Sequence, residues 1–148
     1  MNAKGCLKLS CVLVVSLFLG LLGFLSQSIS PHFTTARYVI EVGCRGHINV
    51  IPNQADGVSV QYVNGAYLFL IPKNGTLKLR YDDPTRNSSV DMSASFTDGT
   101  PIAMPIPTAT NWKKGQLGFI PGGTWGSGKS DYFLGTREDY EKVFWKLP

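Results

Sequence analysis

Cysteine, histidine and charge are all scarce in this sequence of 148 residues. The three cysteines, Cys6, Cys11 and Cys44, are too few and too badly placed for a disulfide scaffold. Neither His32 nor His47 has a neighbour at the spacing of a metal ligand. We therefore expect no structural metal and no cofactor, and a domain that an apolar core holds together. The apolar fraction of 43% suits such a core.

Charge is absent altogether between Lys8 and Arg37. Within this interval Leu9 to Leu25 consists mostly of Leu, Val and Phe, which favour insertion into a bilayer. Extended through Ile29, the segment reaches the ~20 residues that span a membrane. We predict a cytoplasmic tip and transmembrane signal-anchor over residues 1–30.

A cleaved signal peptide is the alternative, because Lys4 and Lys8 form a basic region before the apolar run. Against it, the run is longer than a typical signal-peptide core, and a cut after Ser30 would leave Pro31 next to the cleaved bond. With an anchor, the two lysines place the N-terminus in the cytoplasm. Residues 31–148 then form a domain on the far side of the inner (plasma) membrane, in the periplasm.

The net charge of +4 is weak evidence for an acidic partner. Because two of the basic residues precede the membrane segment, residues 31–148 carry 12 basic and 10 acidic side chains. The predicted domain is thus nearly neutral, and we expect neither nucleic acid nor nucleotide as a partner.

Alternation with period two predicts a mainly β domain. The apolar residues from Tyr38 onward fall on even positions, with Gly43 and Gly46 marking a bulge or bend: Tyr38, Ile40, Val42, Cys44, Ile48 and Val50. A second alternating run covers Val90 to Phe96, and Gln116 to Ile120 fits a final short strand. Pro101, Pro105 and Pro107 assign their segment to a sheet edge or an extended arm, since proline donates no ladder hydrogen bond.

Two Asn-Gly pairs predict hairpins, since both residues tolerate a positive φ. A two-residue turn at Asn64-Gly65 pairs Tyr62 with Tyr67, Val60 with Phe69 and Val58 with Ile71. A second such turn at Asn74-Gly75 sets Leu77, Leu79 and Tyr81 against Leu68 and Leu70. On this pairing Tyr67–Ile71 becomes a central strand covered on both faces.

The C-terminal residues change to a helical period. Tyr140, Val143, Phe144 and Leu147 follow i, i+3, i+4, i+7 spacing, and Thr136 is placed as an N-cap. The predicted fold class is therefore α+β but mainly β: an N-terminal transmembrane helix, an antiparallel meander of hairpins, and a short C-terminal helix on the sheet.

Candidate chemistry is sparse. Residues 123–130 match the letters of a phosphate-binding loop, but no helix pattern follows Lys129, so a Gly/Ser surface loop is the better interpretation. Asp82-Asp83 is expected to be a solvated turn and not a Ca²⁺ site. Cys44 is interpreted as a small buried apolar residue, with an intermolecular disulfide as the alternative.

Three aromatic residues lie in glycine-rich or polar surroundings: Trp112, Trp125 and Tyr132. Aromatic side chains in such positions serve either as part of a core or as a partner-binding patch. They are the candidate binding residues of this sequence, beside Cys44 as a candidate intermolecular thiol.

The sequence combines a basic tip, one membrane segment, a cysteine soon after it at Cys44, and a β-rich exported region containing YVNGAYLFLIPKNGTLKL. This layout resembles the FidL-like small membrane proteins of enteric bacteria, which are similar in layout to the ToxS and PsaF class of accessory proteins. The resemblance implies a periplasmic domain that binds and stabilises the sensor domain of a membrane-bound transcriptional regulator. It assigns no functional residue.

Three functions follow from these observations. The leading one is a non-enzymatic, single-pass envelope protein whose β domain contacts another membrane or envelope protein. The second is a secreted or periplasmic module that binds a small molecule or glycan after signal-peptide cleavage. The third, a thiol- or histidine-dependent enzyme using Cys44 or His47, lacks any supporting constellation of residues.

Overall fold

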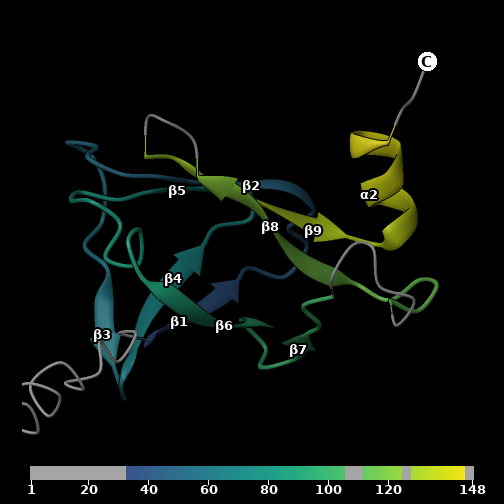
Figure 1. Cartoon of the computed structure of the whole chain (residues 1–148), viewed down its shortest axis with the longest axis horizontal. Coiled ribbons are helices and arrows are strands. Elements are labelled where there is room, and N and C mark those ends of the chain that lie inside the picture. Colours follow the sequence, from purple (N-terminus) through teal and green to yellow (C-terminus); the bar gives the residue numbers. More distant parts are fainter. Residues whose placement is uncertain (1–32, 106–111, 125–127, 146–148) are drawn as a thin grey trace, which may run out of the picture. The chain divides into compact units, whose positions relative to one another are not determined.

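A computed structural model describes residues 33–105, 112–124 and 128–145 (Figure 1). The predicted membrane segment, with Leu9, Leu25 and Ile29, lies outside the described residues, as do Pro107, Trp125 and Leu147. No helix in the described part of the chain is long and apolar enough to cross a bilayer.

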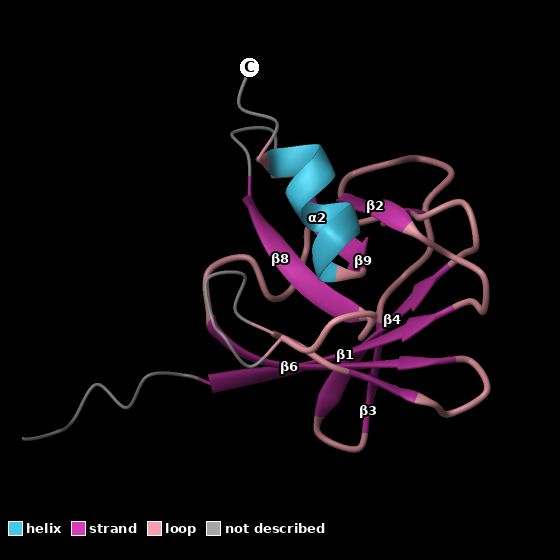
Figure 2. Ribbon diagram, turned by 90° about the vertical axis from the view of Figure 1, so that its right-hand side faces the viewer, coloured by secondary structure: helices cyan, strands magenta, loops and turns pink. Residues whose placement is uncertain are grey.

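The described residues are mainly β and form two mixed sheets and one short C-terminal helix (Figures 1 and 2). One sheet has the strand order β3-β4-β1-β6-β7 and the other the order β5-β2-β9-β8. The elements are β1 (Phe33–Ile40), β2 (Gly46–Ile51), β3 (Gln61–Val63), β4 (Ala66–Ile71), β5 (Thr76–Lys78), β6 (Ser89–Phe96), β7 (Pro101–Ile102), β8 (Gly118–Thr124), β9 (Ser130–Gly135) and α2 (Arg137–Phe144).

The predicted antiparallel meander is wrong, because β1 is parallel to both of its neighbours, β4 and β6. Parallel neighbours require a crossover connection. Here the crossovers are strands of the other sheet: β2 lies between β1 and the β3–β4 hairpin along the chain, and β5 lies between β4 and β6. The chain thus alternates between the two sheets, and strands that are distant in sequence become partners.

Gly43 and Gly46 mark one of these changes of sheet, where a bulge or bend within one strand was expected. Both have positive φ, and β1 ends at Ile40 before them while β2 starts at Gly46 in the other sheet. Even-numbered apolar residues are therefore buried in both β1 and β2, but Val42 lies in the connection between these strands and is exposed.

The Asn64-Gly65 hairpin is confirmed, with both residues at positive φ and Tyr62 opposite Tyr67. Pairing ends at Gln61, however, so the predicted partners of Val60 and Val58 are wrong. Val58 instead forms a parallel bridge with Leu79 of the other sheet.

The predicted Asn74-Gly75 hairpin is wrong, because β5 leaves β4 and pairs with β2 in parallel. Leu77 and Leu79 are consequently buried between the sheets, while Leu70 on the outer face of β4 is 54% exposed. Gly75 has positive φ, and a Cβ there would lie 2.6 Å from the carbonyl oxygen of His47. A glycine is needed at this close approach of β5 to β2.

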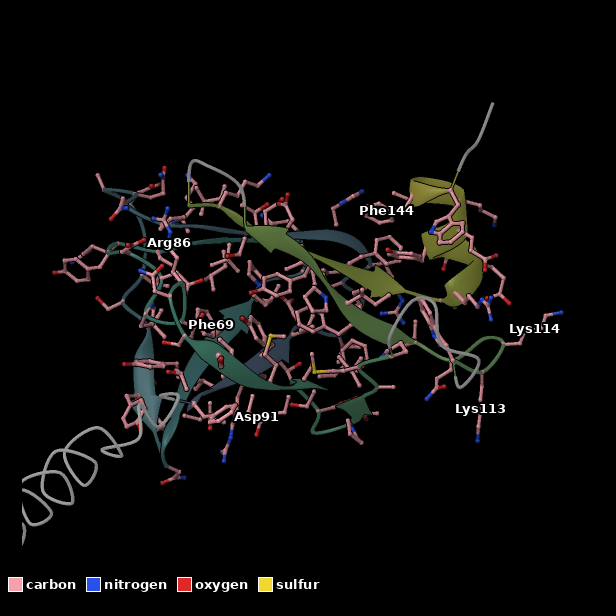
Figure 3. All side chains as sticks on the ribbon, in the orientation of Figure 1. Phe69, Arg86, Asp91, Lys113, Lys114 and Phe144 are labelled. Atoms are coloured by element: carbon pink, nitrogen blue, oxygen red, sulfur yellow. The ribbon has the colours of Figure 1, made fainter. Side chains whose placement is uncertain are left out.

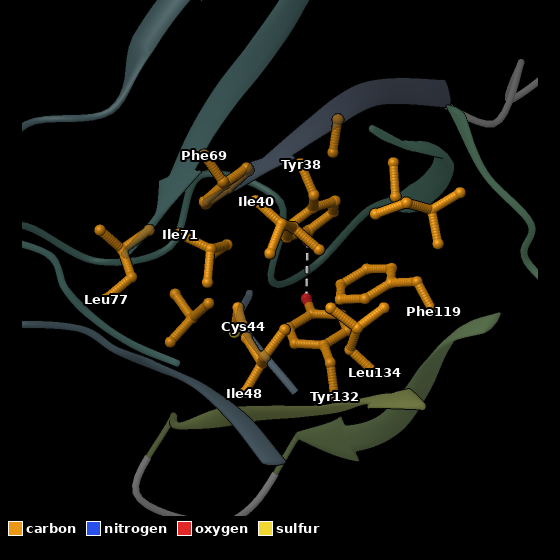
Figure 4. Close-up of a cluster of buried hydrophobic side chains, with 14 of the residues drawn as sticks. Tyr38, Ile40, Cys44, Ile48, Phe69, Ile71, Leu77, Phe119, Tyr132 and Leu134 are labelled. Carbon is orange, nitrogen blue, oxygen red and sulfur yellow. Dashed lines mark hydrogen bonds between the residues drawn. The ribbon is translucent and has the colours of Figure 1, made fainter. Parts of the chain in front are cut away.

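Aromatic rings from both sheets fill the centre of the main core (Figure 4). Tyr38 of β1 stacks on Phe69 of β4 with ring centroids 4.9 Å apart, and Phe119 of β8 stacks on Tyr132 of β9 at 5.0 Å. The predicted alternation of β6 is also confirmed, since Ala94 and Phe96 face this core. Pro101 lies in the edge strand β7, as expected.

The predicted C-terminal helix is confirmed as α2. The Thr136 hydroxyl accepts a hydrogen bond from the backbone N–H of Asp139, and the Asp139 carboxylate accepts one from the N–H of Thr136. Tyr140 packs with Trp112, Ile120 and Phe133 in a second, smaller cluster. Ile120 and Phe133 alternate with Phe119 and Leu134 of the main core, so this cluster lies on the opposite face of the four-stranded sheet. Tyr140 joins α2 to this cluster, and α2 lies beside β8 and β9 (Figure 2).

Candidate functional site

Trp112 and Tyr132 do not form a surface together. They are only 3% and 7% exposed. Tyr132 points into the main core between the sheets, whereas Trp112 belongs to the cluster under α2. The Trp112 indole N–H donates to the Gln116 carbonyl, which satisfies its polar atom within the fold. Both side chains serve packing here.

Cys44 is buried, as the interpretation of an apolar core residue requires. Burial raises the pKa of its thiol, against the opposing effect of Arg45. A thiol that is both inaccessible and hard to ionise is a poor nucleophile and a poor candidate for an intermolecular disulfide.

His47 lies exposed on the outer face of β2, where its ring packs against Phe133 and against Phe144 of α2, which is labelled in Figure 3. Within the described residues, no group of three or more potential ligands lies close enough to hold a metal ion.

The segment that matches the letters of a phosphate-binding loop connects two antiparallel strands. Thr124 ends β8, and Ser130 begins β9 where a phosphate-binding loop would begin a helix. Without a helix N-terminus at this point, the backbone does not supply the dipole and N–H groups that such a loop needs.

The Asp82-Asp83 turn differs from expectation, because Asp83 is only 5% exposed. One of its oxygens, Oδ1, accepts hydrogen bonds from the backbone N–H of Thr85 at 2.9 Å and from the Thr85 hydroxyl at 2.7 Å. Its other oxygen, Oδ2, accepts a longer bond from the Ser130 hydroxyl at 3.5 Å. Asp83 therefore ties the loop after β5 to the start of β9.

A hydrogen-bonded pair of tyrosines extends this polar network into the main core. The Tyr38 and Tyr132 hydroxyls share a hydrogen bond of 2.7 Å, drawn as a dashed line in Figure 4. Burial raises the pKa of both phenols, and the nearby Asp83 carboxylate acts in the same direction. A hollow of about 240 Å³ lies beside this network, with Arg86 and Asp131 among its lining residues.

A larger and more apolar cavity of about 440 Å³ lies between the outer face of β4 and the edge strand β5. We call it the groove. Its apolar wall residues are Val58, Val60, Leu68, Leu70, Pro72, Leu77 and Leu79. Lys78 and Asp56 stand at its rim in an ion pair of 2.7 Å. The groove can hold apolar side chains but offers no buried charge to a ligand.

Residues 57–60, which we call the strap, connect the two sheets beside this groove. The strap is held to β5 by hydrogen bonds from the Val58 N–H to the Lys78 carbonyl and from the Arg80 N–H to the Val58 carbonyl. A second hollow of about 300 Å³ shares the strap with the groove and is otherwise lined by Tyr67, Leu79, Tyr81, Asp82 and Pro84. The strap thus lines both cavities.

The sequence gives no simple signal for these cavities, since they depend on which strands pair. Leu70 was expected to be covered by the residues after Asn74-Gly75, and Val58 to lie opposite Ile71. The change of sheet at β5 uncovers both, and Tyr62, Val63 and Tyr81 are exposed nearby.

No protein-family model matches the chain, and no curated protein does so either. Among solved structures, the fold is similar to a Bacillus anthracis protein described as a "putative lipoprotein", with a TM-score of 0.46 and 13% sequence identity over 72% of each chain.

Proposed function

We propose that this chain is a membrane-anchored envelope protein whose β domain acts by binding another protein, and that it is not an enzyme. The observation that carries the proposal is the apolar surface around the strap. Large apolar side chains that are well exposed there are Val58, Tyr62, Val63, Leu70 and Tyr81. Apolar groups gathered around open cavities are typical of contact surfaces, whereas scattered ones need no explanation.

The length of the connection supports a partner in or near the membrane. β1 begins at Phe33, and residues 30–32 alone separate it from the end of the predicted anchor at Ile29. An extended chain covers at most ~3.6 Å per residue, so Phe33 lies within about 15 Å of the bilayer surface if the anchor is retained. A domain held so close meets other membrane proteins more readily than freely diffusing ones.

The more specific proposal is that the partner is the sensor domain of a membrane-bound transcriptional regulator, with the N-terminus of this chain in the cytoplasm and residues 31–148 in the periplasm. It is supported by the resemblance in layout to the FidL-like proteins.

Photocrosslinking in intact membranes tests the proposal. A photoreactive residue at Leu70 should give an adduct with a different protein, whereas one at Ser93, on the exposed polar face of β6 in the same sheet, should give none. The yield of the adduct should fall when the chain also carries Val58→Lys, but not when it carries Val42→Lys. Val42 is a matched control because it is 51% exposed, against 55% for Val58, and does not line the groove. Adducts with this chain alone, or with none, would contradict the proposal.

A further inference from the structure

The edge strand β3 offers free backbone groups beside the groove. Its hairpin closes with Val63 opposite Ala66, so these two exchange hydrogen bonds and the N–H and C=O of Tyr62 point away from β4. In the described part of the chain no strand pairs with that side of β3. All three residues of β3 are exposed.

The two edges of the five-stranded sheet differ in protection. At the opposite edge, Pro101 in β7 removes a donor. The backbone just beyond it is also occupied, since the N–H of Phe119 in β8 donates to the carbonyl of Ala103. The β3 edge has no proline and no strand bonded beyond it in the described residues, and residues 57–63 contain no charge. Natural proteins usually protect such edges because they pair readily with other chains.

The groove and the second hollow open on different faces of β4, since Leu68 and Leu70 line the first and Tyr67 lines the second. Successive side chains of an added strand also point to opposite faces. A strand laid beside Tyr62 would direct one set of side chains toward the groove, with Leu68 and Leu70, and the other toward the second hollow, with Tyr67 and Tyr81. Neither a helix nor a compact ligand would enter both cavities in this way.

We propose that an extended segment of another protein adds to the β3 edge as a further strand, with alternate apolar side chains in the groove. This inference rests on the proposed function and specifies how the partner binds. The segment is uncharged along its central residues, because the charged groups beside the two cavities already pair with each other, Lys78 with Asp56 and Asp82 with Arg86, and a further charge would lose its hydration without compensation. Main-chain hydrogen bonds supply affinity, and the two cavities supply side-chain specificity.

Peptide binding to the full chain in lipid nanodiscs tests the inference. The probe is a short soluble peptide in which valine and threonine alternate, with glutamate at both ends. Hydrogen exchange of the outward Tyr62 amide should slow by about tenfold at a peptide concentration ten times the Kd. Leu70→Lys should weaken binding, and Val42→Lys should not.

Backbone pairing is separated from side-chain contact by two comparisons. Tyr62→Pro removes the outward N–H and should abolish peptide binding, while Tyr62→Ala keeps the N–H and should preserve it. Because the proline variant could alter the hairpin, the peptide is also N-methylated on its valines or on its threonines. One methylated set should abolish binding and the other should not, since alternate amides of an added edge strand face β3.

The inference is overturned if neither methylated peptide loses affinity, if both do, or if the unmodified peptide gives no protection. It is also overturned if the edge is protected without peptide in a manner that depends on protein concentration or on residues 1–32, since a second copy or the chain's own N-terminal segment would then occupy it. A Leu70 adduct in membranes together with any of these results would leave the proposed function standing and remove only this mode of binding. Peptide protection without an adduct would remove the proposed function and leave β3 as an edge that binds an added strand.

Discussion

Replacing Asp83 by alanine should destabilise the domain by about 2–4 kcal/mol. The substitution removes the acceptor of two short hydrogen bonds, from the backbone N–H and the hydroxyl of Thr85, and of the longer bond from Ser130. Hydrogen bonds to charged groups contribute about 1.5–3 kcal/mol each, and a buried donor that loses its partner costs about 1–3 kcal/mol. Thr85 is itself buried, so water replaces the carboxylate poorly.

Asp82→Ala is the matched control, since it removes a neighbouring carboxylate that is exposed. Asp82 forms an ion pair of 3.4 Å with Arg86 at the surface and accepts a hydrogen bond from the N–H of Asp83. Exposed pairs of this kind contribute about 0–1 kcal/mol. Asp83→Asn keeps the shape of the side chain and one acceptor oxygen, so its loss of stability should lie between those of the two alanine variants.

The assay is urea unfolding of the full chain, followed by tryptophan fluorescence, with buried Trp112 as a reporter within the domain. The midpoint should shift strongly for Asp83→Ala and little for Asp82→Ala, at an unchanged slope. Equal, small shifts for the two alanine variants would show that the buried carboxylate does not hold the loop, and would refute the reasoning.

Three further predictions concern the core. Burial raises the pKa of Tyr38 and Tyr132 above the unfolded value near 10, so the stability from their neutral forms is complete below pH 10 and is lost as the pH rises above it. Tyr38→Phe should lessen this dependence in alkaline urea unfolding, and an unchanged slope would count against the buried pair. The Cys44 thiol should react with a water-soluble disulfide reagent only on unfolding, as labelling assigned to that residue by mass spectrometry would show; rapid labelling of the native protein would contradict its burial. Gly75→Ala should cost more than about 1 kcal/mol of unfolding free energy, and more than Gly65→Ala. Both glycines have positive φ, but a Cβ at Gly75 alone meets the His47 carbonyl, so equal losses would argue against the close approach of β5 to β2.

The local elements of the fold could be predicted from the sequence, but several of the pairings could not. Alternation located β6, the Asn64-Gly65 turn set its own register, and Thr136 marked the start of α2. Asn74-Gly75 carries the same turn signal as Asn64-Gly65, yet the strand after it joins the other sheet. A local turn signal shows where the chain bends, whereas the choice of partner depends on which apolar faces meet in the assembled core.

The same limit applies to the candidate sites. Asp83 lies in a stretch of polar residues, and such stretches are usually solvated. The spacing of Asp83 and Thr85 was the available signal, because an Asp side chain commonly accepts a hydrogen bond from the backbone two residues on. The groove had no local signal, since its walls come from β4, β5 and the strap, and these meet only because the chain changes sheets.

The polar network around Asp83 adjoins, along the chain, one wall of the second hollow. Tyr81, Asp82 and Pro84 line the second hollow, and Asp83 fixes the loop that carries them. Releasing this loop should therefore loosen one wall of the second hollow while leaving the groove and the β3 edge in place. Asp83→Ala should weaken the alternating peptide through the side chains that face this hollow, and replacing the peptide's threonines by alanine should remove most of the difference between the variant and the unaltered chain. If Asp83→Ala weakens both peptides equally, the loop acts on the whole domain and not on this wall. Competition between the two peptides in the hydrogen-exchange assay decides between these outcomes.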